Sequence, residues 1–238
     1  SAFGYSALNA NTTGVNNTAV GYESLNANTT AGYNVAVGYR AAYSNTTGTG
    51  NNAFGYQALQ YNTTGEQNSS VGTNSLRYNT TGDSNTAVGR DALHTNTTAD
   101  NNTAVGYYAL RLNTTGSSNT ASGNYALYSN TTGGQNVALG ESALQNNTTA
   151  SGGTALGWAS LWSNTTGAES LDANTTGANN VSVGYRSLYQ NTTGAANGAF
   201  GYQTLFSNTT GADNVAVGTN ALYNNLTGAN NAAVGRDS

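Results

Sequence analysis

Residues 11–27 read NTTGVNNTAVGYESLNA, and residues 28–44 repeat the same arrangement as NTTAGYNVAVGYRAAYS. The tract Asn-Thr-Thr, which becomes Asn-Leu-Thr in its last copy, returns every 17 residues except for a single interval of 10 residues. Such self-similarity is the signature of a repeat protein. We therefore expect residues 1–238 to form a single repeat array, with residues 164–173 as a shortened copy. The copies begin near residues 11, 28, 45, 62, 79, 96, 113, 130, 147, 164, 174, 191, 208 and 225.

The length of the unit selects the architecture. A helical repeat needs roughly 33 to 47 residues for its helices, and each Gly in a helix interior costs about 1 kcal/mol. The segment T-A-V-G-Y instead alternates in the manner of a strand, with β-branched and aromatic residues. The sequence thus predicts an all-β fold, a parallel β-solenoid or β-roll of about fourteen coils of 17 residues.

Stacking the coils turns each repeated position into a column. We expect the Val and Leu columns to form apolar ladders inside the coil, and buried Asn columns to pair amide to amide. Gly and Asn suit corners with left-handed backbone angles. In the strand, Ala and Gly share one face while Val and Tyr share the other. Both faces carry little charge, which favours a cover on each side, so we expect a homo-oligomer or a fibre.

Composition excludes several classes of function. Only 7% of residues are charged, and the six basic residues are all scattered Arg, so no basic stripe is available for nucleic acid. Apolar runs are too short for membrane insertion, and without Cys the chain has neither disulfides nor thiolate metal sites. The ten acidic residues do not gather in one column, and the sole histidine, His94, is expected on the surface. We therefore predict no enzyme, no catalytic or metal residues and no cofactor.

The Asn-Thr-Thr tracts are formal N-glycosylation sequons. Two interpretations stay open: turns whose Asn and Thr form hydrogen-bonded ladders, or sites that carry glycans. Because Asn and the second Thr lie two residues apart, they would also share a strand face, which leaves ice binding as a lesser alternative. The candidate glycosylation sites are Asn11, Asn28, Asn45, Asn62, Asn79, Asn96, Asn113, Asn130, Asn147, Asn164, Asn174, Asn191, Asn208 and Asn225.

One column is rich in aromatic residues but also accepts Thr, Asn, Arg and Glu, so we expect it to be partly exposed. It is interpreted as a stacked surface ladder or subunit contact, with a carbohydrate-binding strip as the alternative. Its aromatic members are Tyr5, Tyr22, Tyr39, Tyr56, Tyr107, Trp158, Tyr185 and Tyr202.

The element N-x-A-V-G-Y-x-A-L resembles the head repeats of trimeric autotransporter adhesins. The longer unit N-T-A-V-G-Y-x-A-L-x-x-N-T-T-G is similar to arrays in phage tail-fibre-like proteins. The resemblance covers nearly the whole chain and implies a left-handed parallel β-roll, commonly a trimer, on a cell surface or virion.

The function predicted from the sequence is an extracellular structural fibre or fibril subunit whose partner is another copy of itself, as a trimer or another homo-oligomer, or stacked end to end in a filament. The alternative is an adhesin or tail-fibre shaft that binds surface glycans.

Overall fold

A computed structural model describes residues 1–160, 179–184 and 186–238, which group into two compact units, Ser1–Asn119 and Thr120–Ser238. The predicted fold class is confirmed, because the described chain is an all-β parallel solenoid with one short strand per coil. Unit 1 contains β1 (Ala2–Phe3), β2 (Thr18–Val20), β3 (Val35–Val37), β4 (Asn52–Phe54), β5 (Ser69–Val71), β6 (Thr86–Val88) and β7 (Thr103–Val105). Unit 2 contains β8 (Thr120–Ser122), β9 (Val137–Leu139), β10 (Thr154–Leu156), β11 (Val181–Val183), β12 (Gly198–Phe200), β13 (Val215–Val217) and β14 (Ala232–Val234).

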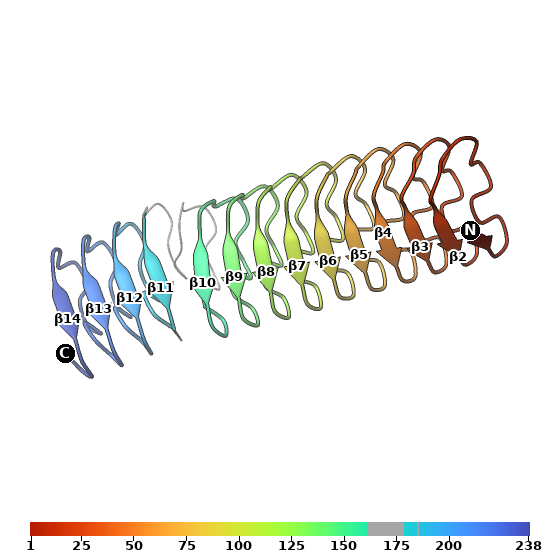
Figure 1. Cartoon of the computed structure of the whole chain (residues 1–238). Coiled ribbons are helices and arrows are strands. Elements are labelled where there is room, and N and C mark those ends of the chain that lie inside the picture. Colours follow the sequence, from red (N-terminus) through yellow and green to blue (C-terminus); the bar gives the residue numbers. More distant parts are fainter. Residues whose placement is uncertain (161–178, 185) are drawn as a thin grey trace. The chain divides into compact units, whose positions relative to one another are not determined.

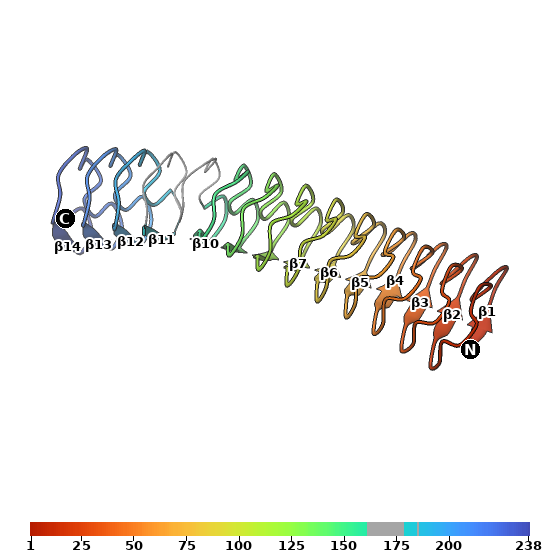
Figure 2. The ribbon, with the colours of Figure 1, turned by 90° about the horizontal axis from the view of Figure 1, so that it is seen from above.

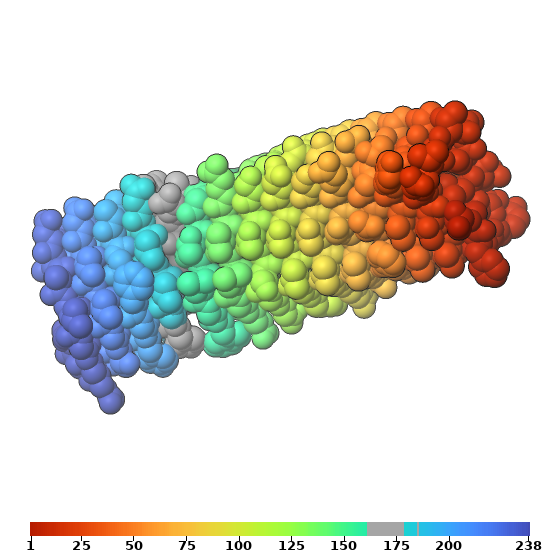
Figure 3. Space-filling view, in the orientation of Figure 1, coloured from red at the N-terminus to blue at the C-terminus, as the bar shows by residue number. Residues whose placement is uncertain are grey.

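Within each unit the strands pair in parallel and in chain order, as their aligned arrows show in Figure 1. The register places each residue beside its equivalent 17 positions later, so that Ala19 lies opposite Ala36 and Val20 opposite Val37. Seen from above, each coil is a loop with its strand along one side (Figure 2). Side chains from successive coils consequently line up in rows on the surface of each unit (Figure 3).

The interior is lined by small residues from the strand and by leucines from the opposite side of the coil. Ala19 and Leu25 have no exposed surface, and their equivalents in later coils repeat this burial. Where Ser70 replaces Ala in the strand, the facing residue is Ser75, and the two hydroxyls hydrogen bond to each other. The paired replacement leaves neither hydroxyl without a partner, as a buried polar group requires.

The Val column corrects a sequence prediction. The Leu column is inside, as expected, but Val20, Val88 and Val217 point outward with 37%, 38% and 38% of their surface exposed. Alternation put Ala and Val on opposite faces, and the inner face takes the smaller side chain. The interior at the strand is therefore narrow, and the stack has an apolar outer face.

The corner after each strand depends on glycine. Gly89 has φ +133°, and a Cβ built on it would lie 2.5 Å from the carbonyl oxygen of Gly106 in the next coil. The turn that follows contains left-handed residues of many types, including Asp91 (φ 53°) and Leu93 (φ 49°). A left-handed leucine costs roughly 1–2 kcal/mol, and its full burial, worth about 1.5–3 kcal/mol, offsets this cost. Asn also takes such left-handed positions, as expected, for example Asn74 (φ 56°) and Asn101 (φ 59°), while the two main Asn columns lie inside the coil.

Candidate functional site

The Asn-Thr-Thr tracts form a buried amide ladder, which confirms the prediction of stacked Asn side chains. In the third Asn-Thr-Thr tract, Asn45 Nδ2 donates to Asn28 Oδ1 at 3.0 Å and to the carbonyl oxygen of Gly48 at 2.9 Å. The next rung repeats this pattern, with Asn62 Nδ2 at 2.8 Å from Asn45 Oδ1. These tract asparagines have no exposed surface: Asn28, Asn45, Asn62, Asn79, Asn96, Asn113, Asn130, Asn147, Asn191 and Asn208.

This burial bears directly on the sequons. A glycan replaces one of the two Nδ2 hydrogens, so attachment at Asn45 would remove one of its two hydrogen bonds and place the sugar on an atom buried in the coil. Asn11 and Asn225 are half-buried, and their Nδ2 atoms donate to the carbonyl oxygens of Gly14 and Gly228. The candidate sites Asn164 and Asn174 lie outside the described residues, as does the shortened copy 164–173. The described geometry thus favours the ladder interpretation of the tract.

The two Thr residues of each tract have different environments. The first donates its hydroxyl to the next coil, as when Thr63 Oγ1 lies 3.0 Å from the carbonyl oxygen of Thr80. The second, such as Thr64, is exposed, whereas the tract residue Asn62 is buried. The expectation that Asn and the second Thr share a face is therefore wrong, and the two-wide array on which the ice-binding alternative depended does not form in the described coils.

A second buried Asn ladder precedes most of the strands. Asn51 Nδ2 donates to the carbonyl oxygen of Gly65 at 2.8 Å, and its Oδ1 accepts the backbone N–H of Asn68 at 3.0 Å. The same carbonyl of Gly65 also accepts from Asn62 Nδ2 at 2.9 Å. The two ladders converge on one carbonyl in several of the described coils, and most of the interior amides thus link one coil to the next.

The outward face of the strands is uncharged. In each three-residue strand, β2 to β14, the first and third residues point away from the coil interior, and none of them is charged. We call these two columns the outer strand face. Phe54, Val71 and Val105 show how its apolar side chains stay exposed, at 40%, 42% and 40% of their surface. The third-residue column is apolar except at Ser122, and a contiguous apolar surface of this kind marks an interaction site.

The predicted aromatic column borders the outer strand face. In unit 1 the rings of Tyr5, Tyr22, Tyr39 and Tyr56 stack at 5.1, 5.3 and 5.2 Å between centroids. Further along the column in unit 1, Tyr107 stacks on its neighbour Tyr108, at 3.9 Å. Tyr185 lies outside the described residues, while Trp158 and Tyr202 are exposed in unit 2.

Sequence reasoning did not identify a second aromatic column. In unit 2, Tyr189, Phe206 and Tyr223 stack with centroid distances of 5.1 and 4.9 Å. In unit 1, Tyr61 and Tyr78 stack at 5.2 Å. The signal was present in the sequence, because each neighbouring pair in these stacks is separated by 17 residues.

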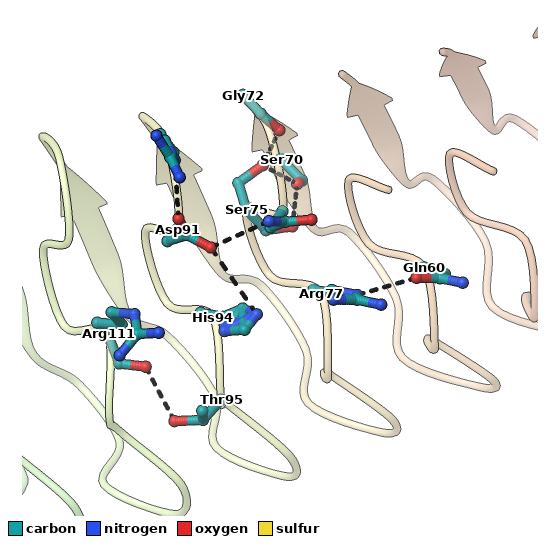
Figure 4. Close-up of polar contacts among 11 residues, drawn as sticks. Gln60, Ser70, Gly72, Ser75, Arg77, Asp91, His94, Thr95 and Arg111 are labelled. Carbon is teal, nitrogen blue, oxygen red and sulfur yellow. Dashed lines mark hydrogen bonds and ion pairs between the residues drawn. The ribbon is translucent and has the colours of Figure 1, made fainter. Parts of the chain in front are cut away.

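His94 is not the surface residue that we expected. Its side chain is only 13% exposed, and it lies beside Asp91, Arg77 and Arg111, as Figure 4 shows. Nε2 is 3.8 Å from Asp91 Oδ1, and the ring packs edge-on against Tyr78 with centroids 5.0 Å apart. Burial lowers the pKa of His94, and the nearby Arg111 and Arg77 lower it further, while Asp91 opposes them. The neutral imidazole is therefore the form that the fold favours.

Unit 2 contains a pocket of about 300 Å³ on the side of the coil that bears the aromatic columns. Its lining combines two aromatic rings with carboxylate, guanidinium, amide and hydroxyl groups. The residues are Glu141, Ser142, Gln145, Trp158, Ala159, Arg186 and Tyr189. Only Trp158 was singled out from the sequence, because the pocket joins columns that the repeat pattern treats as separate.

Within residues 1–160, 179–184 and 186–238, no group of three or more His, Asp or Glu side chains could hold a metal ion. The same residues include no helix that is long and apolar enough to cross a bilayer. Neither a family model, nor a curated protein, nor a solved structure matches the chain.

Proposed function

We propose that this chain is a structural subunit of an extracellular fibre or fibril, in which the stacked solenoid is itself the functional element. The observation that carries the proposal is the outer strand face, which is uncharged and combines an apolar third-residue column with a first-residue column of mainly Thr and Val. Its location outside a cell or on a virion rests on the resemblance to adhesin and tail-fibre repeats.

The partner that best fits the outer strand face is a second copy of this chain. An uncharged face gives no charged group to desolvate and so presents no electrostatic barrier to burial against an identical face. Its rows also repeat at one coil spacing, so the ridges of one copy match the grooves of another along their whole length. A homo-oligomer, including the trimer that the resemblance implies, would cover this face.

Sedimentation of the purified chain over a range of concentrations tests this proposal. Introducing charge with Val20→Lys and Val88→Lys should shift an oligomer toward monomer, because lysine would be buried without a counter-charge. Thr81→Lys is the matched control, since Thr81 is exposed in an Asn-Thr-Thr turn away from the outer strand face. A wild-type chain that stays monomeric up to its solubility limit, or a control that dissociates as readily, would contradict the proposal. Negative-stain images then distinguish discrete oligomers from filaments.

A second candidate is a shaft that also binds carbohydrate, as in an adhesin. The specific observation in its favour is the pocket beside Trp158, where an exposed aromatic ring meets several hydrogen-bonding groups.

A further inference from the structure

The pocket lies where the repeat spacing is interrupted. Elsewhere in the paired strands, equivalent residues are 17 positions apart, as with Ala138 and Ala155 in β9 and β10. From β10 to β11 the paired residues are Ala155 and Ser182, a separation of 27 positions. The interruption therefore advances the sheet by one strand only, and it changes the geometry at the corner that follows.

That corner is wider than the others in unit 2. At Gly140 an added Cβ would lie 2.3 Å from the next coil, whereas at Gly157 no atom of the described residues lies within 4 Å. The backbone N–H of Gly184 is 3.4 Å from its acceptor, the Leu156 carbonyl, while Gly157 N–H is 2.8 Å from the equivalent Leu139 carbonyl. Each residue of the aromatic column directly follows one of these glycines in the sequence, as Trp158 follows Gly157. The wider spacing between the coils at Gly157 therefore opens space beside Trp158.

The groups around this space are chemically complementary. Trp158 is 59% exposed and offers an aromatic surface, while the Arg186 guanidinium lies over the Tyr189 ring at 5.3 Å from its centroid. Arg186 can only donate hydrogen bonds, ionised Glu141 can only accept them, and Gln145 and Ser142 can do both. The single carboxylate and the single guanidinium balance each other, so the pocket has no net charge.

We propose that this pocket binds a neutral saccharide of one or two rings, an inference that rests on the carbohydrate-binding alternative and not on fibre assembly. The apolar C–H face of a sugar packs on an aromatic ring, and its hydroxyls need both donors and acceptors, which this lining supplies. A volume of about 300 Å³ is at the lower end of the roughly 300–1,000 Å³ typical of ligand pockets, which limits the ligand to a small saccharide.

The stacked tyrosines of unit 1 offer a different surface. The rings of Tyr22 and Tyr39 are each sandwiched between ring neighbours at 5.1–5.3 Å, so their faces are covered and only their edges reach solvent. A sugar needs a ring face for C–H packing. The inner rings of this stack therefore leave no open ring face for a sugar.

Saturation-transfer NMR and tryptophan fluorescence with a panel of sugars test the assignment. The panel contains glucose, galactose, mannose, N-acetylglucosamine and their disaccharides, with glucuronate and glucosamine as charged comparators. Trp158→Ala and the milder Glu141→Gln should each weaken binding of the neutral sugar, the first by about tenfold, because an aromatic contact is lost. Tyr22→Ala, a ring sandwiched on both faces in the stacked column of unit 1, is the matched control and should leave the affinity unchanged. Far-UV circular dichroism verifies that each variant keeps its β structure.

Three results would overturn the proposal: no neutral sugar on the panel binds, the charged comparators bind in preference, or Tyr22→Ala weakens binding while Trp158→Ala does not. Loss of affinity in Glu141→Gln alone would still support the site if Trp158→Ala does not fold. Sedimentation of the same variants separates the two functions, because the pocket variants leave the outer strand face unaltered.

Discussion

Asn85→Ala tests whether the buried amides hold the coils together. Asn85 has no exposed surface, and its Oδ1 accepts the backbone N–H of Asn102 at 3.0 Å. Its Nδ2 donates to the carbonyl oxygen of Ala99 at 2.8 Å and to Asn68 Oδ1 at 3.2 Å. In the variant, Ala99 keeps its bond from Asn96 Nδ2, and Asn68 Oδ1 keeps the backbone N–H of residue 85. The group left without a partner is therefore the N–H of Asn102.

The expected loss of stability follows from this inventory. A buried donor without an acceptor costs about 1–3 kcal/mol, and each hydrogen bond removed contributes roughly 0.5–1.5 kcal/mol. Because two of the three partners, both of them acceptors, keep other donors, we expect Asn85→Ala to lower the free energy of unfolding by about 2–4 kcal/mol. The matched control is Thr81→Ala, an exposed side chain, for which a change within about 0.5 kcal/mol is expected.

Two measurements check the value and its cause. Urea unfolding followed by far-UV circular dichroism gives the loss of stability, and amide hydrogen exchange reports the Asn102 N–H directly. Asn85→Asp adds a pH test, because burial raises the folded pKa of the new carboxyl above its usual value near 4. The protonated acid can donate to the Ala99 carbonyl, so this variant should gain stability as the pH falls and lose it as the pH rises through the folded pKa. If Asn85→Ala is as stable as Thr81→Ala and the Asn102 amide exchanges no faster, the ladder argument is refuted.

Three further changes have defined outcomes. Gly89→Ala should destabilise the fold by at least about 2 kcal/mol, through backbone strain and a collision with the next coil. Gly157→Ala should show only the backbone strain, because its Cβ would meet no atom of the described residues. The urea midpoints of the two variants compare these costs. Leu93→Ala should cost about 2–5 kcal/mol by leaving a cavity, measured in the same way. Because folding lowers the pKa of His94, its contribution to folding stability is present above the unfolded pKa of about 6.5 and is lost as the pH falls. In His94→Gln, the folding stability between pH 7 and 5 should therefore depend less on pH. A pH dependence equal to that of the wild type would contradict the lowered pKa.

Periodicity alone was enough to predict the solenoid, the inward Leu column and the amide ladders. Once a unit of 17 residues repeats, equal side chains must stack, and stacked buried amides can satisfy one another. Alternation could not tell which strand face is inside. A ranking by hydrophobicity placed Val there, but the narrow coil accepts the Ala side chain, as at Ala19, and leaves Val20 outside.

Local preferences also failed where tertiary contacts decide the conformation. Leucine rarely adopts a left-handed backbone, so nothing in the sequence indicated φ 49° at Leu93, where burial compensates for the strain. The sequons were ambiguous for a similar reason, because Asn-Thr-Thr reads alike in an exposed acceptor loop and in an inward ladder. The environment of His94 depends on Arg77 and Arg111 in the neighbouring coils, and the variable column predicted only a surface position.

The interruption near β10 affects two features of the stack in one place. The ladder of pre-strand asparagines lacks a side chain at Gly153, whose N–H still donates to Asn136 Oδ1 at 2.8 Å, and the change in repeat spacing follows directly afterwards. In the regular coils each inward position is constrained by the next coil, as the invariant glycines show, so chemical variety is confined to outward columns. Those columns lie over closely stacked coils in the regular part of the chain. The widened step after Gly157 instead leaves varied outward side chains around a hollow, which is the arrangement that selective binding of a small ligand requires.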